Sequence, residues 1–154
     1  MEELRIIVKA RPVGQPRPRA ARFGNNIRIY NPPTADEWRL AVELAAVEAA
    51  RDQEWEPTEE PLGLRVVFWM PRPKAHHKAS GELKDSAPTF CHTKPDLDNL
   101  LKSTTDALET SGIVVRDQQV VAIEAVKLYG PEGAVGANLT LSEATSCTNL
   151  DNHG

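Results

Sequence analysis

Alternating apolar and polar residues mark the strands that this chain is expected to form. In residues 62–70, LGLRVVFWM, every second side chain from Leu64 to Met70 is large and apolar, which places these side chains on one face of an extended segment. Segments rich in β-branched residues and bounded by Pro or Gly predict further strands at 4–10, 119–129 and 134–142, and a short one at 27–30.

Two stretches follow the helical period instead. Thr34 and Glu37 have the spacing of a capping box at the start of a helix. The apolar face that follows consists of Trp38, Ala41, Val42, Ala45 and Ala49, widened by Leu40, Leu44 and Val47. A second helix is predicted from about Asp98 to a stop at Gly112. Its expected buried side is made of Leu97, Leu101, Thr104 or Thr105, and Leu108.

Together these elements predict one α+β domain over residues 1–142, in which a mixed sheet of about four strands carries two helices on one side. Residues 143–154 are polar and predict a flexible C-terminal tail. Residues 11–26 and 71–95 are rich in Pro and lack a regular period, so we expect loops there. A structureless connection as long as the second is usually functional or disordered.

Composition places the chain among ordinary globular proteins, with 40% hydrophobic and 26% charged residues. No apolar run approaches the roughly 20 residues that a membrane-spanning helix needs, and the N-terminus lacks the form of a signal peptide. Cys91 and Cys147 are far apart in sequence. We therefore expect a reduced, cytoplasmic protein with no membrane partner.

The formal net charge of −4 alone argues against a nucleic-acid partner, but the charges are unevenly distributed. Residues 1–39 contain eight Lys or Arg against four acids, and residues 72–94 contain five against two. Basic patches matter more than totals for phosphate binding, although two solvated loops are an equal alternative. The candidate DNA contacts are Arg17, Arg19, Arg22, Lys74, Lys78 and Lys94.

Asp96 and Asp98 lie one residue apart at the start of the second predicted helix. Asp98 suits a helix N-cap, but that role does not account for Asp96. In extended chain after Pro95 the two side chains point the same way, so their carboxylates would converge on one point. A hard divalent cation, Mg²⁺ or alternatively Mn²⁺, would relieve their repulsion because these metals take oxygen ligands. The D-x-D pattern alone is weak, since it occurs often by chance.

Lys102 lies four residues after Asp98, on the same helix face. It either forms a weak ion pair there or reaches toward a bound phosphate. Asp117 follows the helix, where a short return loop would bring it back. Three carboxylates and a lysine around a metal are the groups that phosphodiester hydrolysis needs, because the metal activates water and the lysine neutralises developing charge.

A longer pattern, PDLDNLLKSTTDALETSG followed by RDQQV, resembles the signature of the RusA-type Holliday-junction resolvases, particularly their phage-borne branch. The shared positions are Asp96, Asp98, Asn99, Leu100, Lys102, Asp106, Ala107, Leu108, Gly112, Asp117, Gln119 and Val120. The resemblance extends more weakly over residues 4–142. Many members have two acids where this chain has Arg116 and Asp117, and some have a run of arginines where it has only Lys94.

The resemblance implies a small Mg²⁺-dependent endonuclease that acts as a homodimer. Such an enzyme resolves four-way DNA junctions by paired symmetric nicks, in recombination and repair, inside a bacterial cell or a phage-infected host. It assigns Asp96, Asp98 and Asp117 to the metal, makes Lys102 the essential lysine and gives Asn99 a supporting place. It implies no small-molecule cofactor. Two alternatives stay open: a nuclease for other branched DNA, such as flaps or forks, and a catalytically idle DNA-binding module of the same fold.

Four further residues, His76, His77, Cys91 and His92, are of the types that bind zinc. Their spacing fits no standard zinc finger, so a loop that lies on DNA is the favoured interpretation. Trp38 and Trp69 lie on patterned faces and are predicted to belong to the core.

Overall fold

The computed structural model describes residues 3–30 and 33–144. Four strands form one sheet in the order β1 (Leu4–Val8), β6 (Gly136–Glu143), β4 (Leu62–Met70) and β5 (Val120–Tyr129). The β4–β5 pair is parallel and the other two pairs are antiparallel. The predicted α+β domain with a mixed four-stranded sheet is therefore confirmed. Most of the predicted tail, residues 145–154, lies outside the described residues.

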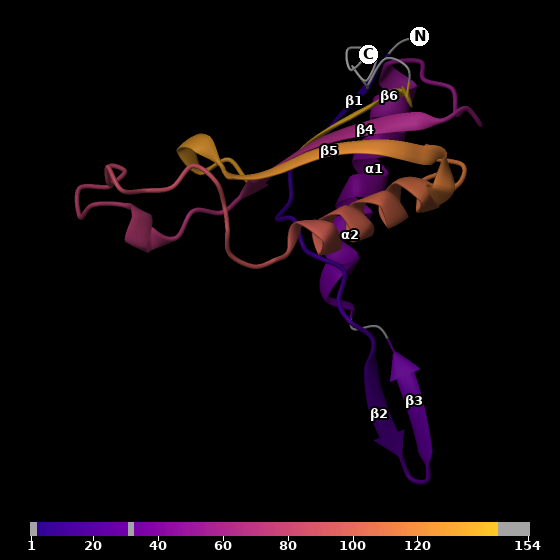
Figure 1. Ribbon diagram of the computed structural model, residues 1–154, viewed down its shortest axis with the longest axis horizontal. Helices are drawn as coiled ribbons and strands as arrows, with labels where there is room; N and C mark the ends of the chain where they lie inside the picture. The colour runs from indigo at the N-terminus through magenta and orange to yellow at the C-terminus, as the bar shows by residue number, and fades with distance from the viewer. Residues whose placement is uncertain (1–2, 31–32, 145–154) are drawn as a thin grey trace, which may run out of the picture.

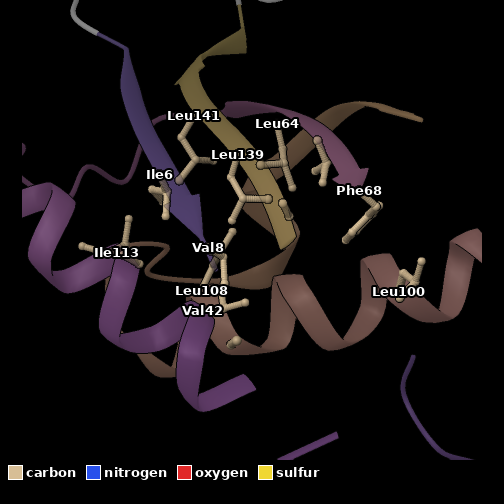
Figure 2. Close-up of a cluster of buried hydrophobic side chains, with 14 of the residues drawn as sticks. Ile6, Val8, Val42, Leu64, Phe68, Leu100, Leu108, Ile113, Leu139 and Leu141 are labelled. Atoms are coloured by element: carbon tan, nitrogen blue, oxygen red, sulfur yellow. The ribbon is translucent and has the colours of Figure 1, made fainter. Parts of the chain in front are cut away.

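Both long helices, α1 (Asp36–Asp52) and α2 (Leu97–Thr110), cover the same face of this sheet (Figure 1). The strands turn alternate side chains toward them, and cross-strand register stacks these side chains in rows such as Ile6, Leu139 and Val66. Figure 2 shows how this cluster fills the space between helices and strands. Trp38 is fully buried there and donates its indole N–H to Thr104 Oγ1 at 3.2 Å, which joins the two helices.

The helix starts differ from the sequence prediction. A 3₁₀ turn, Pro33–Ala35, precedes α1, and no side chain caps the helix, so the predicted capping box of Thr34 and Glu37 is wrong. The apolar face of α1 is narrower than expected, because Leu40, Leu44 and Val47 remain exposed. Its buried residues are Trp38, Val42, Ala46 and Ala50.

The buried side of α2 is rotated relative to the prediction. Leu100, Ser103, Thr104, Ala107 and Leu108 are buried, whereas Leu97 and Leu101 are only half-buried. Both leucines still pack against the edge of the core cluster. The predicted stop at Gly112 is confirmed, since this residue takes a φ of 84° that disfavours any side chain.

A β-hairpin replaces the second half of the loop predicted at 11–26. Strands β2 (Arg19–Phe23) and β3 (Asn26–Tyr30) pair only with each other and project away from the domain (Figure 1). The short strand predicted at 27–30 is confirmed as β3. Strand β2 was not predicted, because it buries no face and no apolar alternation marks it.

The connection over 71–95 forms a second projection on another side of the domain (Figure 1). It contains a 3₁₀ turn, Lys74–His76, and a bridge between His77 and Leu83. A second bridge, from Phe90 to Leu128, ties its return path to the outer edge of β5. Among the described residues no helix is both long and apolar enough to cross a membrane.

Candidate active site

The β4–α2–β5 unit, in which the two strands are parallel, determines at which end of α2 each predicted site residue lies. A helix that connects two parallel strands runs back along them, so the N-terminus of α2 lies at the carboxyl end of β5 and its C-terminus at the start of β5 (Figure 1). Asp96 immediately precedes α2, and Asp117 begins the 3₁₀ turn that leads into β5. Because the 14-residue helix is about 21 Å long, the chain does not bring Asp117 back to Asp96.

Asp96 and Asp98 lie at the N-terminus of α2 with different backbone conformations. Asp96 occupies the N-cap position with extended φ and ψ of −66° and 143°, and it makes no side-chain cap. Asp98 is already in the first helical turn, so the prediction of Asp98 as the N-cap is wrong. The extended backbone that was expected to make the two side chains point the same way is also absent, because the helix begins at Leu97.

Both carboxylates are exposed and nearly without partners. Among the described residues the Asp96 carboxylate has no hydrogen-bond or ion-pair partner, and the Asp98 carboxylate accepts only the backbone N–H of Asn99, at 3.0 Å. The free amides of the first helical turn favour negative charge at this position. The pair therefore stays available to a cation.

Lys127, on β5, holds the chain that leads into α2. Its ammonium donates hydrogen bonds to the carbonyls of Thr93 and Pro95, the latter at 2.6 Å. The peptide between Lys94 and Pro95 is cis. Sequence reasoning missed Lys127, since nothing in its strand sets it apart from a solvated lysine.

Lys102 is exposed and lies one turn beyond Asp98. Its ammonium lies 3.9 Å from the carboxylate of Asp106, an i,i+4 contact within α2. Such a contact on a surface contributes at most about 1 kcal/mol, so it leaves Lys102 free to turn toward an anion near Asp98.

A strap formed by residues 13–15 fastens the N-terminal segment to α2. The Gln15 N–H donates to the Asn99 carbonyl at 2.9 Å, and Ser103 Oγ donates to the Val13 carbonyl at 2.7 Å. At Gly14 a Cβ atom would lie 3.1 Å from the Asn99 Cβ, so a larger residue would require the strap or the helix to shift by a few tenths of an ångström.

A groove of about 810 Å³ runs between the strap and the start of α2. Its wall combines three basic side chains with Asp96 and the half-buried Asn99. The lining residues are Arg11, Pro12, Val13, Gly14, Gln15, Arg17, Lys94, Pro95, Asp96 and Asn99.

Gln119 positions Asp117 at the opposite end of α2. Its buried amide accepts the N–H groups of Val115 and Arg116, at 2.7 and 3.1 Å, and donates to the carbonyls of Thr58 and Glu60. All four bonds fix the turn that carries the exposed Asp117. Gln119, the second glutamine of the RDQQV motif, thus has a structural role that sequence reasoning did not assign.

The chain as a whole matches a known family of nucleases. The model of the endodeoxyribonuclease RusA family matches residues 9–140, which is most of the chain. The chain belongs to the RusA endodeoxyribonuclease family. A protein from Bacillus subtilis (strain 168), the uncharacterized protein YqaN, is 28% identical over 137 residues, which cover 88% of this chain and 94% of that protein.

The RusA-family match spans both ends of α2, with Asp96, Asp98 and Lys102 at one end and Asp117 at the other. Within residues 3–30 and 33–144, no three His, Cys, Asp or Glu side chains lie close enough to hold one metal ion. The assignment of the three aspartates to a metal therefore stays a prediction for this RusA-family chain. Cys91 is buried in the core and belongs to its packing.

Two basic projections flank the aspartate pair of this RusA-family chain. The β2–β3 hairpin carries Arg19 and Arg22, and the 71–95 segment carries Lys74 and Lys78, all exposed. The start of α2 lies between the bases of the two projections (Figure 1). Their role in DNA binding stays a prediction.

Within the 71–95 segment, Arg72 and His76 pack on Tyr129. The Arg72 guanidinium lies 4.8 Å from the Tyr129 ring centroid and donates to the Pro88 carbonyl at 2.8 Å. The His76 ring meets the same tyrosine edge-on at 4.9 Å. Partial burial, and then the charge of Arg72, hold the pKa of His76 below its usual 6.5. The lowered pKa favours the neutral form of His76.

Proposed function

We propose that this RusA-family chain is a Mg²⁺-dependent endonuclease that resolves four-way DNA junctions by paired nicks. One observation carries the proposal: two exposed carboxylates, Asp96 and Asp98, stand nearly without partners at the N-terminus of α2, between two basic projections. Unpaired acids beside basic surface suit a cation that is shared with phosphate. Family membership supports the endonuclease chemistry.

The residues present fit a hard divalent cation, because Asp96, Asp98 and Asp117 supply only oxygen donors. Such an ion, when bound, polarises a phosphoryl oxygen and the attacking water. Lys102 lies where its charge would stabilise the phosphorane-like transition state, and Arg11, Arg17 and Lys94 along the groove would position the DNA strand.

A second copy of the chain would reunite the separated aspartates. If two α2 helices pack antiparallel about a two-fold axis, Asp117 of one copy approaches Asp96 and Asp98 of the other, and the same contact is made twice. An apolar patch supports this arrangement: Val115, Val121 and Ile123 are exposed next to Asp117, at the start of edge strand β5.

This arrangement also explains why two nicks would be symmetric. A two-fold dimer has two equivalent sites, and a four-way junction offers two equivalent strands. Among the described residues, the backbone of β5 bonds to the returning segment at residues 89–91 only through Lys127 and Tyr129, so the outer edge of β5 is open along its first half.

The test is cleavage of a synthetic four-way junction, a flap and a linear duplex, each with and without Mg²⁺. We expect cutting of the junction alone, only with Mg²⁺, and its loss in Asp96→Asn, Asp98→Asn and Asp117→Asn variants that still bind the junction. Each substitution removes a charge but keeps the shape of the side chain. A variant that cuts at the wild-type rate would remove that aspartate from the site.

The same assay decides between the alternatives. Preferred cutting of the flap would indicate a nuclease for other branched DNA. Junction binding without cutting at any Mg²⁺ or Mn²⁺ concentration would indicate an idle DNA-binding module.

A further inference from the structure

The β2–β3 hairpin exposes large apolar side chains that contact nothing in the core. Phe23, Ile27 and Ile29 have 60%, 72% and 77% of their surface exposed. An isolated two-stranded ribbon is only marginally stable in water, and exposed apolar clusters commonly mark binding surfaces. The hairpin therefore needs a partner that covers it.

The charge of the hairpin restricts the chemistry of that partner. Residues 4–35 contain no Asp or Glu, whereas Arg19, Arg22 and Arg28 all lie within the hairpin. A surface that combines three guanidinium groups with uncovered apolar groups is complementary to a polyanion that also presents flat apolar faces. Unstacked nucleobases on a phosphate backbone meet both conditions.

Cross-strand register distributes these groups over both faces of the ribbon. One face pairs Arg19 with Tyr30, and on it the Arg28 guanidinium lies 5.7 Å from the centroid of the Phe23 ring. The other face pairs Arg22 with Ile27. Phe23 lies next to the turn and Ile27 one residue further along, on the opposite face, so the far end of the ribbon, which we call the hairpin tip, presents one large apolar side chain on each face.

The strap connects this tip to the aspartate pair. Residues 13–15 are hydrogen-bonded to α2, and the chain then continues past Arg17, at the groove, into β2. Five residues of extended strand span about 17 Å, which equals about five base-pair steps at 3.4 Å each. A DNA strand that lies in the groove beside Asp96 would thus reach the hairpin within a few nucleotides.

We propose that Phe23 and Ile27, at the hairpin tip, contact the unstacked bases at the branch point of junction DNA. This inference rests on the proposed function and names the feature of the substrate that is recognised. Intact duplex offers the tip little, because its base faces are stacked and the thymine methyl is the main apolar group in the major groove. At a branch point, base faces are uncovered and can stack on an aromatic ring.

The experiment compares wild type, Phe23→Ala and Phe23→Tyr in Ca²⁺, which prevents turnover. Affinity is measured for a four-way junction and for a duplex with the sequence of its arms. The junction carries 2-aminopurine, whose fluorescence reports stacking, at the branch point. We expect Phe23→Ala to lose about tenfold in affinity for the junction and not for the duplex, the size of effect that one stacked base gives. The fluorescence response should vanish with it, and Phe23→Tyr should retain both.

Equal losses on junction and duplex, or unchanged junction affinity, would overturn the inference. A loss of dimer in sedimentation equilibrium would overturn it too, because the tip would then bind a second copy, for which the exposed Leu40, Leu44 and Val47 of α1 offer an apolar row. Failure of the proposed nuclease is distinct: it would remove Mg²⁺-dependent cutting and leave the dependence of junction binding on Phe23 intact. Because Phe23 lies outside the core, its substitution should not unfold the protein. Equal melting temperatures of wild type and variants would verify this.

Discussion

The immediate neighbours of Asp96 and Asp98 leave both carboxylates available to a cation. The first turn of α2 favours negative charge, and Lys127 holds the carbonyls of Thr93 and Pro95 on the approach to the helix. Lys127 makes its hydrogen bonds to backbone and not to the carboxylates, so it positions Asp96 without neutralising it by contact.

Replacing Lys127 should make the position of Asp96 less well defined. We expect Lys127→Met to raise the Mg²⁺ concentration at half-maximal junction cleavage several-fold, since two hydrogen bonds to the chain before α2 are lost. A Mg²⁺ titration of the cleavage rate measures the effect. Arg51→Met, which removes one exposed positive charge at the far end of α1, serves as the control. A Lys127→Met titration that matches the control would exclude a positioning role.

His76 makes a separate prediction about acid stability. Its pKa in the folded protein is lowered, by partial burial and then by Arg72, so the unfolded chain binds the proton more readily. Stability should therefore be lost as the pH falls through about 6.5 toward the lower pKa of the folded state. Between pH 7.5 and 5.5, the melting temperature of wild type should fall more than that of His76→Gln. Parallel melting curves for the two proteins would contradict this.

At the scale of elements, hydrophobic patterning predicted the strands and helices that bury side chains in the core. β4 begins and ends at the predicted residues because its alternate side chains are buried from Leu64 to Met70. Strand β2 of the hairpin was not predicted, because none of its side chains is buried in the core and only its pairing with β3 defines it as a strand. The missing cap at α1 has a similar cause, since Thr34 lies in a 3₁₀ turn that overrides its local preference.

The candidate site was predicted from sequence at the level of residue types, but not in its geometry. The D-x-D pair and Lys102 do lie together at one end of α2. Asp117 lies at the other end, because a helix that connects parallel strands carries the chain away from its starting point. A sequence motif can identify the D-x-D pair, Lys102 and Asp117, but the distance between the two ends of α2 depends on how the strands pair.

The basic N-terminal segment should behave as an electrostatic element. Replacing Arg17, Arg19 and Arg22 together with Ala should weaken junction binding and flatten the dependence of log K on log salt by about two to three units, if each arginine contacts one phosphate. Binding measured at several salt concentrations gives the slope. An unchanged slope and affinity would mean that these exposed arginines are only solvated.

The whole molecule combines a net charge of −4 with basic projections on either side of the aspartate pair. Its acids are concentrated elsewhere, for example in Glu54, Glu56, Glu59 and Glu60 between α1 and β4. This segregation lets a protein of negative net charge present locally basic surface. One chain nevertheless lacks a complete set of ligands in the part that the structure describes.

Mixing two inactive variants tests most directly whether the aspartates at the two ends of α2 form one metal site across a dimer. Asp96→Asn and Asp117→Asn should each fail to cut a four-way junction in Mg²⁺. After the two are unfolded and refolded together, each mixed dimer should hold one intact site and one doubly altered site. Cutting should return to about a quarter of the wild-type number of sites, because about half of the dimers are mixed. The products should be single nicks and not paired ones. A mixture that stays inactive, although mixed dimers are shown to form, would contradict the shared site.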